Sequence, residues 1–434
     1  MPLLLALLLA ACQSGLPAAP ALPPDPAPSS AQPAHAPPAV QTGAQRLVAG
    51  GFAELRGLRV GLVTNHTALV DTADGGPAHL IDRLHAAPAV TLAALFGPEH
   101  GLRGTAEAGD RVRDGRDPAT GVPVYSLYGE TRKPTPAQLR GLDVLVFDMQ
   151  DIGARFYTYI STMGLAMQAA AEAGIPFVVL DRPNPIGDRV EGPVIEARHR
   201  SFVGLFAIPV THGLTVGELA RMIQGERLLA GLERLDLRVV ALKGYTRNMP
   251  WEATGLPWVP PSPNVPDVET ARLYPGAGLF EGTAASEGRG TRTPFRLVGA
   301  PGVDAAALAA ALNGRGLPGV RFEAAPFTPV SIPGMASGPR LEGRALGGIR
   351  IVVTDAEAFR PLETGVHLLH AFYHAVPAAQ RRTFFRADWL AKLYGTDRLR
   401  ARLVAGDRPE AIVAAWAADA EAFRARRAPY LLYP

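Results

Sequence analysis

The stretch DVLVFDMQDIGARFYTYISTMGLAMQAAAEAGIPFVVLD, residues 143–181, decides the fold. It begins and ends with short apolar, β-branched runs, and the segment YTYISTMGLAMQAAAEAG between them predicts a helix closed by Gly174. Two strands joined by a crossover helix lie parallel in one sheet. This stretch therefore predicts a parallel α/β unit.

Strand-like runs on both sides extend this unit. They are LRVGLVT (58–64), VTLAALF (90–96) and LRVVALK (237–243). Strands spaced by helices in this way predict an α/β protein with a doubly wound, mostly parallel sheet. From about Arg296 a second pattern of helices and strands begins, which predicts a smaller C-terminal α+β domain over residues 296–434. It ends in PEAIVAAWAADAEAFRAR, which predicts one helix with a core-facing side.

The first 45 residues have a different character. Residues 1–12 combine a short apolar run with Leu9-Ala10-Ala11-Cys12, which resembles a bacterial lipobox, although no Lys or Arg precedes the run. Cys12 is the only cysteine of the chain, so we predict that it is lipidated; the alternative is an incidental residue of a cleaved signal. Residues 13–45, rich in Pro, Ala and Ser, predict a tether. The expected location is outside the cytoplasm, on a membrane, at its periplasmic or cell-surface side.

Composition and missing motifs exclude several classes of protein. The formal net charge is +3 without a long basic run, so nucleic acid is not an expected partner. The chain has no G-x-G-x-x-G after the first strand, no phosphate-binding loop, no G-x-S-x-G and no H-E-x-x-H. We therefore expect neither a cofactor nor a metal. A metal site built from His66, His100, His212 and Asp148 is the weaker alternative.

Polar residues follow the predicted strands where each strand ends. The strand-end segments contain Asn65-His66, Gly97-Pro98-Glu99-His100-Gly101, Asp148-Met149-Gln150-Asp151, Asp181-Arg182-Pro183-Asn184-Pro185 and His212-Gly213. In an open α/β sheet, ligands bind outside the carboxyl ends of the strands. The sequence therefore predicts a ligand pocket at this edge of the sheet.

Nine motifs in a fixed order resemble the NamZ-type exo-β-N-acetylmuramidases, a family formerly known as a domain of unknown function. The motifs are GLVTNHT (61–67), LFGPEHGLRG (95–104), VFDMQDIGARFYTYISTM (146–163), LDRPNPIG (180–187), THGLTVGELA (211–220), MPW (249–251), PSPNVP (261–266), YPG (274–276) and EGTAASEGRGTRTPF (281–295). The resemblance implies a Rossmann-like catalytic domain with long site loops over residues 46–295. It also implies release of N-acetylmuramic acid (MurNAc) from the non-reducing end of peptidoglycan fragments such as MurNAc-GlcNAc, in cell-wall turnover or recycling.

Glycosidic cleavage needs a carboxylic acid at the leaving oxygen and usually a second carboxylate. Glu99, in the PEHG match, is the predicted general acid or base; the alternative is that it caps a helix. His100 is expected to tune the proton affinity of Glu99 or to hold the sugar. The candidates for the second group are Asp148, Asp151 and Glu281. Asp148 has two further readings, binding the substrate or orienting backbone amides.

Muramic acid carries a lactyl carboxylate, for which we expect a cation, ideally the planar fork of an arginine. The candidates are Arg155, Arg182, Arg289 and Arg292, of which Arg155 and Arg289 are favoured. Tyr157, Tyr159 and Trp251 are candidates for stacking on the sugar, while Asn65, Asn184, His212 and Asn264 are candidates for hydrogen bonds to it. Tyr159 has an equally good reading as a core residue, and Asn184 and Asn264 as turn residues. Two other functions stay open: a muropeptide-binding lipoprotein without catalysis, and a metal-dependent hydrolase.

Overall fold

The structure is a computed structural model of the chain, and it describes residues 40–71, 76–98, 102, 114–129 and 131–434. The predicted signal segment, Cys12 and residues 13–39 of the predicted tether lie outside the described residues, whereas α1 begins at Gly43. Within the described part, no helix is both long and apolar enough to span a membrane.

The main sheet has seven strands in the order β11-β8-β7-β1-β4-β6-β5. Their bounds are β1 (Arg59–Thr64), β4 (Thr91–Gly97), β5 (Gly115–Arg116), β6 (Pro123–Ser126), β7 (Val144–Asp148), β8 (Phe177–Leu180) and β11 (Leu237–Val240). All neighbours pair in parallel except β5 and β6. The six parallel strands follow the order of a doubly wound Rossmann sheet, which reverses between β1 and β7. The predicted fold class is confirmed.

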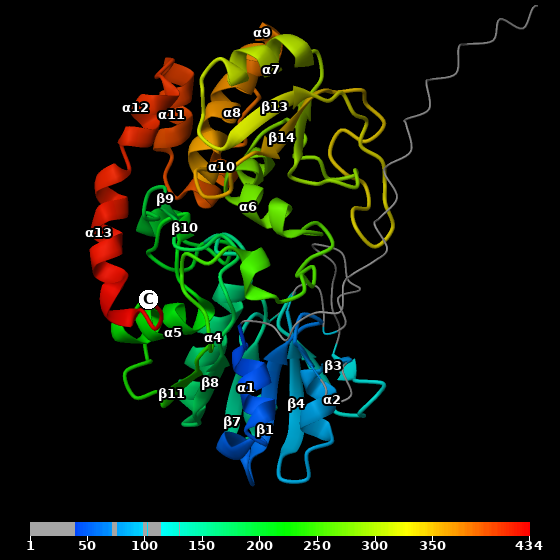
Figure 1. Cartoon of the computed structure of the whole chain (residues 1–434), viewed down its shortest axis with the longest axis vertical. Coiled ribbons are helices and arrows are strands. Elements are labelled where there is room, and N and C mark those ends of the chain that lie inside the picture. Colours follow the sequence, from blue (N-terminus) through cyan, green and yellow to red (C-terminus); the bar gives the residue numbers. More distant parts are fainter. Residues whose placement is uncertain (1–39, 72–75, 99–101, 103–113, 130) are drawn as a thin grey trace, which may run out of the picture. The chain divides into compact units, whose positions relative to one another are not determined.

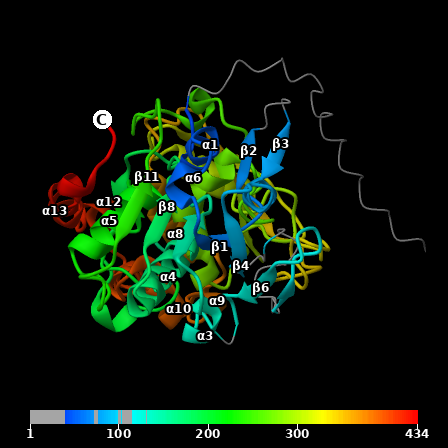
Figure 2. The same ribbon diagram turned by 90° about the horizontal axis from the view of Figure 1, so that it is seen from below.

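Helices cover both faces of this sheet (Figure 1, Figure 2). The helices α1 (Gly43–Ala49) and α2 (Leu80–His85) share one apolar cluster with alternate strand residues such as Leu62. On the other face, α4 (Tyr159–Ala173) and α5 (Val216–Gly225) share a second cluster with the intervening residues such as Val63. Successive side chains of a strand point to opposite faces, so strands that are apolar at every position must be covered twice.

The helix predicted between β7 and β8 is α4. It ends as expected at Gly174, whose positive φ of 70° lets the chain turn out of the helix through a left-handed conformation. This places the loop between Asp148 and Tyr159 at the carboxyl end of β7, where the sheet order reverses. The described loop thus enters the crevice in which doubly wound folds bind ligands.

The C-terminal part contains a three-stranded antiparallel sheet, β12 (Leu297–Ala300), β14 (Gly347–Val353) and β13 (Val320–Ala324). Its larger helices are α7 (Ala305–Asn313), α8 (Pro361–Ala375), α10 (Ala387–Tyr394) and α11 (Arg398–Ala405). This small sheet with its helices confirms the expected α+β character. One apolar cluster joins Phe147 of the parallel sheet to Phe372 of α8, and the domain boundary at residue 295 stays a prediction.

The last predicted helix is interrupted. It consists of α12 (Pro409–Ala414) and α13 (Ala417–Arg427), because the backbone of Trp416 leaves the helical conformation with φ −102° and ψ 0°. The Trp416 ring lies 6.1 Å from the ring of Tyr394 and is buried. Despite the interruption, the residues that the helical pattern places on the core-facing side are buried. They are Ile412, Trp416, Ala420 and Phe423.

The remaining elements are short or connect the two sheets. They are β2 (Leu69–Asp71), β3 (Pro77–His79), α3 (Pro136–Leu139), β9 (Val190–Glu191), β10 (Thr211–His212), α6 (Val268–Ala277) and α9 (Ala378–Arg381), with the 3₁₀ helices η1 (Ala53–Leu55), η2 (Ala197–His199), η3 (Trp251–Thr254), η4 (Gly278–Gly282) and η5 (Ala428–Tyr430). Of these, α6 and η4 matter most for the site described below, because each contributes a residue to it, Tyr274 from α6 and Glu281 from η4.

Candidate active site

A cavity with a volume of ≈ 470 Å³ lies against the loop that follows β7. This is within the size range of small-molecule sites, which is roughly 300–1,000 Å³. Residues from the β7–α4 loop, from the irregular segment before α6, from η4 and from α10 form its walls. The lining residues used below are Arg132, Phe156, Tyr157, Tyr159, Phe202, Asn264, Tyr274, Glu281, Arg289, Phe295, Trp389 and Lys392.

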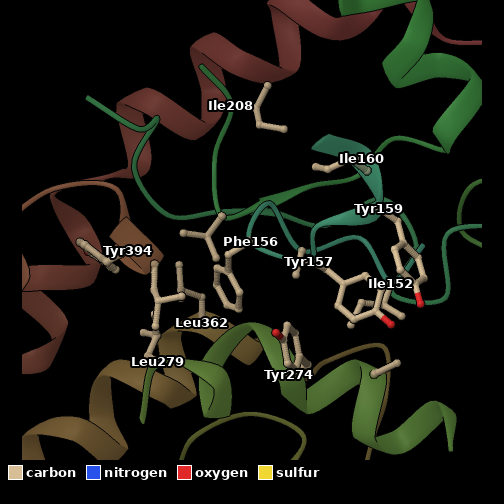
Figure 3. Close-up of a cluster of buried hydrophobic side chains, with 14 of the residues drawn as sticks. Ile152, Phe156, Tyr157, Tyr159, Ile160, Ile208, Tyr274, Leu279, Leu362 and Tyr394 are labelled. Atoms are coloured by element: carbon tan, nitrogen blue, oxygen red, sulfur yellow. The ribbon is translucent and has the colours of Figure 1, made fainter. Parts of the chain in front are cut away.

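Aromatic side chains form one wall of this cavity, among them Phe156, Tyr157, Tyr159 and Tyr274. Figure 3 shows these four rings gathered in one cluster. The ring of Tyr157 lies 4.9 Å from that of Tyr159 and 5.8 Å from that of Tyr274, both edge to face. The Tyr159 hydroxyl donates to the carbonyl oxygen of Pro261 at 2.5 Å. Burial, followed by the neighbouring tyrosines, raises the pKa of Tyr157 well above its ordinary value, so this phenol keeps its proton.

Glu281 and Arg289 form a second, charged wall, and the buried Glu287 contacts Arg289. Arg289 donates to Glu281 at 2.9 Å, and its Nε lies 3.3 Å from Glu287. Burial raises the pKa of Glu287, and the charge of Glu281 raises it further. Burial alone disfavours the charged form of Arg289, but the two carboxylates outweigh it and raise its pKa above the ordinary value. Arg289 is therefore a permanent cation that is already paired with protein carboxylates.

Asp151 lies beside this aromatic wall. It is only 6% exposed; its Oδ2 accepts from the backbone N–H of Gly153 at 2.7 Å, and its Oδ1 has no partner among the described residues. Burial is the main reason that its pKa rises to about 7. Its charge also raises the pKa of Tyr157, so the two groups are electrostatic neighbours. A carboxyl that is half protonated near neutral pH is suited to acid–base catalysis.

Asn264 supplies an unused acceptor at the cavity. Its Nδ2 donates to the carbonyl oxygen of Met335 at 2.7 Å, which fixes the orientation of the amide. Its Oδ1 is buried and has no partner within the described chain. A buried amide oxygen without a partner is costly unless a ligand fills the gap, so Asn264 is placed to accept from a sugar hydroxyl or an acetamido N–H.

Arg155 and Asn184, both predicted to bind the substrate, have structural partners instead and do not line this cavity. Arg155 is fully buried and donates to three carbonyl oxygens, those of Pro193 (3.0 Å), Ile208 (2.8 Å) and Leu393 (2.9 Å). Asn184 accepts from Ile186 N–H and donates to the carbonyl oxygen of Leu214, as a turn residue does. Arg155 is thus a clamp between distant segments, and not a residue of the pocket wall.

His212 is also held within the protein. Its Nδ1 accepts from the backbone N–H of Leu214 at 3.2 Å. Burial lowers its pKa to about 3, and the charge of Arg427 adds to this effect. The imidazole is therefore neutral at physiological pH.

A second group of predicted residues gathers where β1 and β7 end. Asp148 and Arg182 form a buried two-point ion pair, with distances of 2.5 Å and 3.0 Å. Arg182 and Trp251 line a small hollow of ≈ 40 Å³. The side chain of Asn65 accepts from Thr67 at 2.6 Å and stays within its own loop. The ion pair explains both charged residues of this group structurally, and the hollow is too small for a sugar.

The predicted Glu99 and His100 follow β4, which ends at Gly97, and lie outside the described residues. Arg292 is described and exposed, and it does not line the cavity. For the metal alternative, His66 contacts the carbonyl oxygen of Pro260 at 2.6 Å. Among the described residues, the group whose side chains are close enough to share a metal ion does not include these histidines. It consists of Glu196, His199 and Asp397.

Several cavity residues were not predicted as site residues. Tyr274 lines the cavity and belongs to the YPG motif, for which we predicted no role. Glu287, in the last motif, does not line the cavity but contacts Arg289, which does. Four further lining residues belong to none of the nine motifs, and no sequence pattern marked them as site residues. They are Trp389 and Lys392 of α10, Arg132 and Phe202. The spacing of α10 is that of an ordinary amphipathic helix, so nothing local distinguishes a cavity-facing residue from a surface residue.

Another cavity of ≈ 500 Å³ lies elsewhere and is lined by Arg189, Glu191, Arg272 and Arg360, among others. It contains none of the predicted site residues. Arg189 donates to the carbonyl oxygens of Ile186 and Phe359, and Glu191 accepts from the first N–H groups of α8. Its charged groups thus serve the fold, and we assign the site to the cavity beside β7.

Comparisons with known proteins point to one family. The model described as exo-beta-N-acetylmuramidase NamZ, N-terminal, matches residues 60–269, and its C-terminal counterpart matches residues 272–433. The chain is 43% identical over 397 residues to the peptidoglycan beta-N-acetylmuramidase NamZ of Bacillus subtilis (strain 168), covering 91% of this chain and 92% of the relative.

Two solved structures of DUF1343 family proteins from Bacteroides fragilis NCTC 9343 are similar to this one. The first has a TM-score of 0.84 at 39% identity and covers 92% of this chain and 100% of that chain. The second has a TM-score of 0.75 at 36% identity and covers 91% of this chain and 99% of that chain.

Proposed function

The chain belongs to the NamZ family of exo-β-N-acetylmuramidases, and we propose that the cavity beside β7 is where it releases MurNAc from the non-reducing end of peptidoglycan fragments such as MurNAc-GlcNAc. Members of this family are glycosidases, and the chain is therefore a glycosidase. The observation that carries the assignment of the site is an aromatic wall and the carboxyl group of Glu281 on one sugar-sized cavity. The buried carboxyl of Asp151 is the electrostatic neighbour of Tyr157 in that wall.

The chemistry of glycoside hydrolysis explains why this combination matters. The leaving oxygen must receive a proton, and a second carboxylate must act as base or nucleophile at the anomeric carbon. We assign the role of proton donor to Asp151, whose carboxyl is about half protonated near neutral pH. We assign Glu99 to the same reaction because of its place in the PEHG motif. The tyrosine rings and Asn264 bind and orient the sugar.

Incubation of the wild-type protein with MurNAc-GlcNAc is expected to release free MurNAc and GlcNAc in equal amounts, measured by liquid chromatography with mass detection. The isomer GlcNAc-MurNAc, with muramic acid at the reducing end, is the matched control and should stay intact. Binding of MurNAc-GlcNAc without release would favour the non-catalytic muropeptide-binding protein. Release that stops on thorough chelation and returns only with a divalent cation would favour the metal-dependent hydrolase.

We further propose that the chain is exported and anchored to a membrane through a lipid on Cys12. The apolar run, the lipobox-like Leu9-Ala10-Ala11-Cys12 and the Pro-rich tether that follows support this. Cys12→Ala is expected to move the protein from the membrane fraction to the soluble fraction and to abolish incorporation of a labelled fatty acid. Ser14→Ala is the matched control. Membrane association that persists in Cys12→Ala without label would contradict the anchor.

A further inference from the structure

We propose that Lys392, with Trp389 one helical turn before it, recognises the lactyl carboxylate that distinguishes MurNAc from GlcNAc. The proposal rests on the proposed function, because it assumes that MurNAc occupies the cavity beside β7. It assigns the choice of sugar to α10 of the C-terminal part, and not to Arg155 or Arg289.

The cations that line the cavity are Arg132, Arg289 and Lys392. Arg289 is paired with Glu281 and contacts Glu287, so a lactyl carboxylate placed there would meet two protein carboxylates and only one cation. Like charges held close together in a poorly solvated site repel one another. This wall therefore suits the reacting part of the sugar better than its carboxylate.

Lys392 is the better placed of the other two cations. It is half-buried, and within the described chain no carboxylate oxygen lies within the 4.0 Å of an ion pair from its ammonium group. Its Nζ lies 6.0 Å from the centre of the Trp389 ring. Arg132 is exposed and lies over the ring of Phe202, at 4.4 Å. A partly desolvated ammonium binds a carboxylate more strongly than one in open water does.

Trp389 and Lys392 are three residues apart on α10 and therefore lie on the same side of the helix. An indole ring offers a flat apolar face for the C–H groups of a pyranose, and the ammonium provides three donors beside it. Together they match a sugar that carries a short acidic substituent. GlcNAc would contact the ring but would leave the ammonium unpaired.

The position of α10 relative to the charged wall is fixed by close packing. A Cβ at Gly282 would lie 2.8 Å from the Cα of Leu390, so only glycine allows η4 to approach α10 this closely. The backbone N–H of Arg386 donates to the carbonyl oxygen of Gly282 at 2.9 Å. At the other end of α10, Arg155 donates to the carbonyl oxygen of Leu393, next to Lys392. The backbone of α10 that carries Trp389 and Lys392 is thus held in a set relation to η4 and to Glu281.

The test measures binding of three ligands by calorimetry: MurNAc, its lactyl amide and GlcNAc. Lys392→Met is expected to weaken binding of MurNAc about 10-fold, as loss of one charge-assisted hydrogen bond does, and to leave the amide and GlcNAc unchanged. Lys392→Arg should retain most of the preference for the acid. Lys133→Met is the matched control, because Lys133 is ion-paired with Glu172 and does not line the cavity.

The proposal is overturned if Lys392→Met binds MurNAc as the wild type does, or if it loses MurNAc and the amide equally. It is also overturned if Arg132→Met, and not Lys392→Met, removes the preference for the acid. Because these are binding measurements, they separate the two ideas. Lys392-dependent binding of MurNAc without hydrolysis would refute the proposed function alone, whereas hydrolysis with unchanged selectivity in Lys392→Met would refute this inference alone.

Discussion

Glu99→Gln is expected to lower kcat for MurNAc-GlcNAc by about 10²–10⁴-fold, the usual contribution of a general acid or base, while KM changes little. Gln keeps the size and polarity of Glu but cannot exchange a proton at neutral pH. Glu99 follows the strand β4, next to β1 at the centre of the sheet, and belongs to the PEHG motif on which the resemblance to the family partly rests. The measurement is the initial rate of MurNAc release at saturating disaccharide.

Glu107→Gln is the matched control, because it makes the same chemical change eight residues further along the chain, and it should retain activity. A p-nitrophenyl glycoside of MurNAc then separates the two roles open to Glu99. Its leaving group needs no proton, so an acid-deficient variant should lose far less activity on it than on the disaccharide. Equal losses on both substrates would make Glu99 the base or nucleophile, and an unchanged kcat would remove it from catalysis.

The architecture was predictable because it depends on local patterns. The strand runs are apolar at nearly every position, and this pattern is typical of strands covered on both faces. Residues that follow parallel strands must meet at one edge of the sheet, so Asn65, Asp148 and Arg182 were expected to lie together, and they do. Their partners were not predictable, since Asp148 and Arg182 pair with each other.

Arg155 and Lys392 show where local patterns stop being informative. Arg155 stands in a strand-end loop, as a ligand-binding arginine would, yet its guanidinium is bound to the carbonyl oxygens of residues 193, 208 and 393. The sequence around position 155 gives no indication that carbonyl groups so far away in the chain will surround this arginine. Conversely, Lys392 lies in an ordinary amphipathic helix and reaches the cavity only because α10 docks on η4. Both assignments depend on tertiary contacts, which a single sequence does not specify.

Asp151→Asn is expected to have two opposite effects, a loss of activity and a gain in stability at alkaline pH. Burial raises the pKa of Asp151 from 3.8 to about 7. Well below pH 3.8 the carboxyl is protonated in both the folded and the unfolded chain, so its burial costs no ionisation free energy. As the pH rises from 4 to 7, the unfolded chain ionises first, and the free energy of unfolding falls by roughly 4 kcal/mol, about 1.4 kcal/mol for each pH unit.

Asparagine cannot ionise, so Asp151→Asn should unfold at a higher urea concentration than the wild type at pH 8 and at a similar one at pH 4. Asp388→Asn, which changes an exposed aspartate of α10, should show no such pH-dependent difference. If Asp151 is the proton donor, kcat of the wild type should fall as the pH rises through about 7. In Asp151→Asn, kcat should be about 10²–10⁴-fold lower and should no longer fall as the pH rises through about 7.

The two measurements together decide the role of Asp151. A buried carboxyl that destabilises the folded chain at neutral pH is a candidate for proton transfer, because an amide of the same shape would serve packing at a lower cost. A more stable and inactive variant would therefore identify Asp151 as part of the reaction. A more stable variant with unchanged kcat would restrict Asp151 to shaping the loop, through its bond from Gly153, and would leave Glu281 as the carboxyl at the cavity.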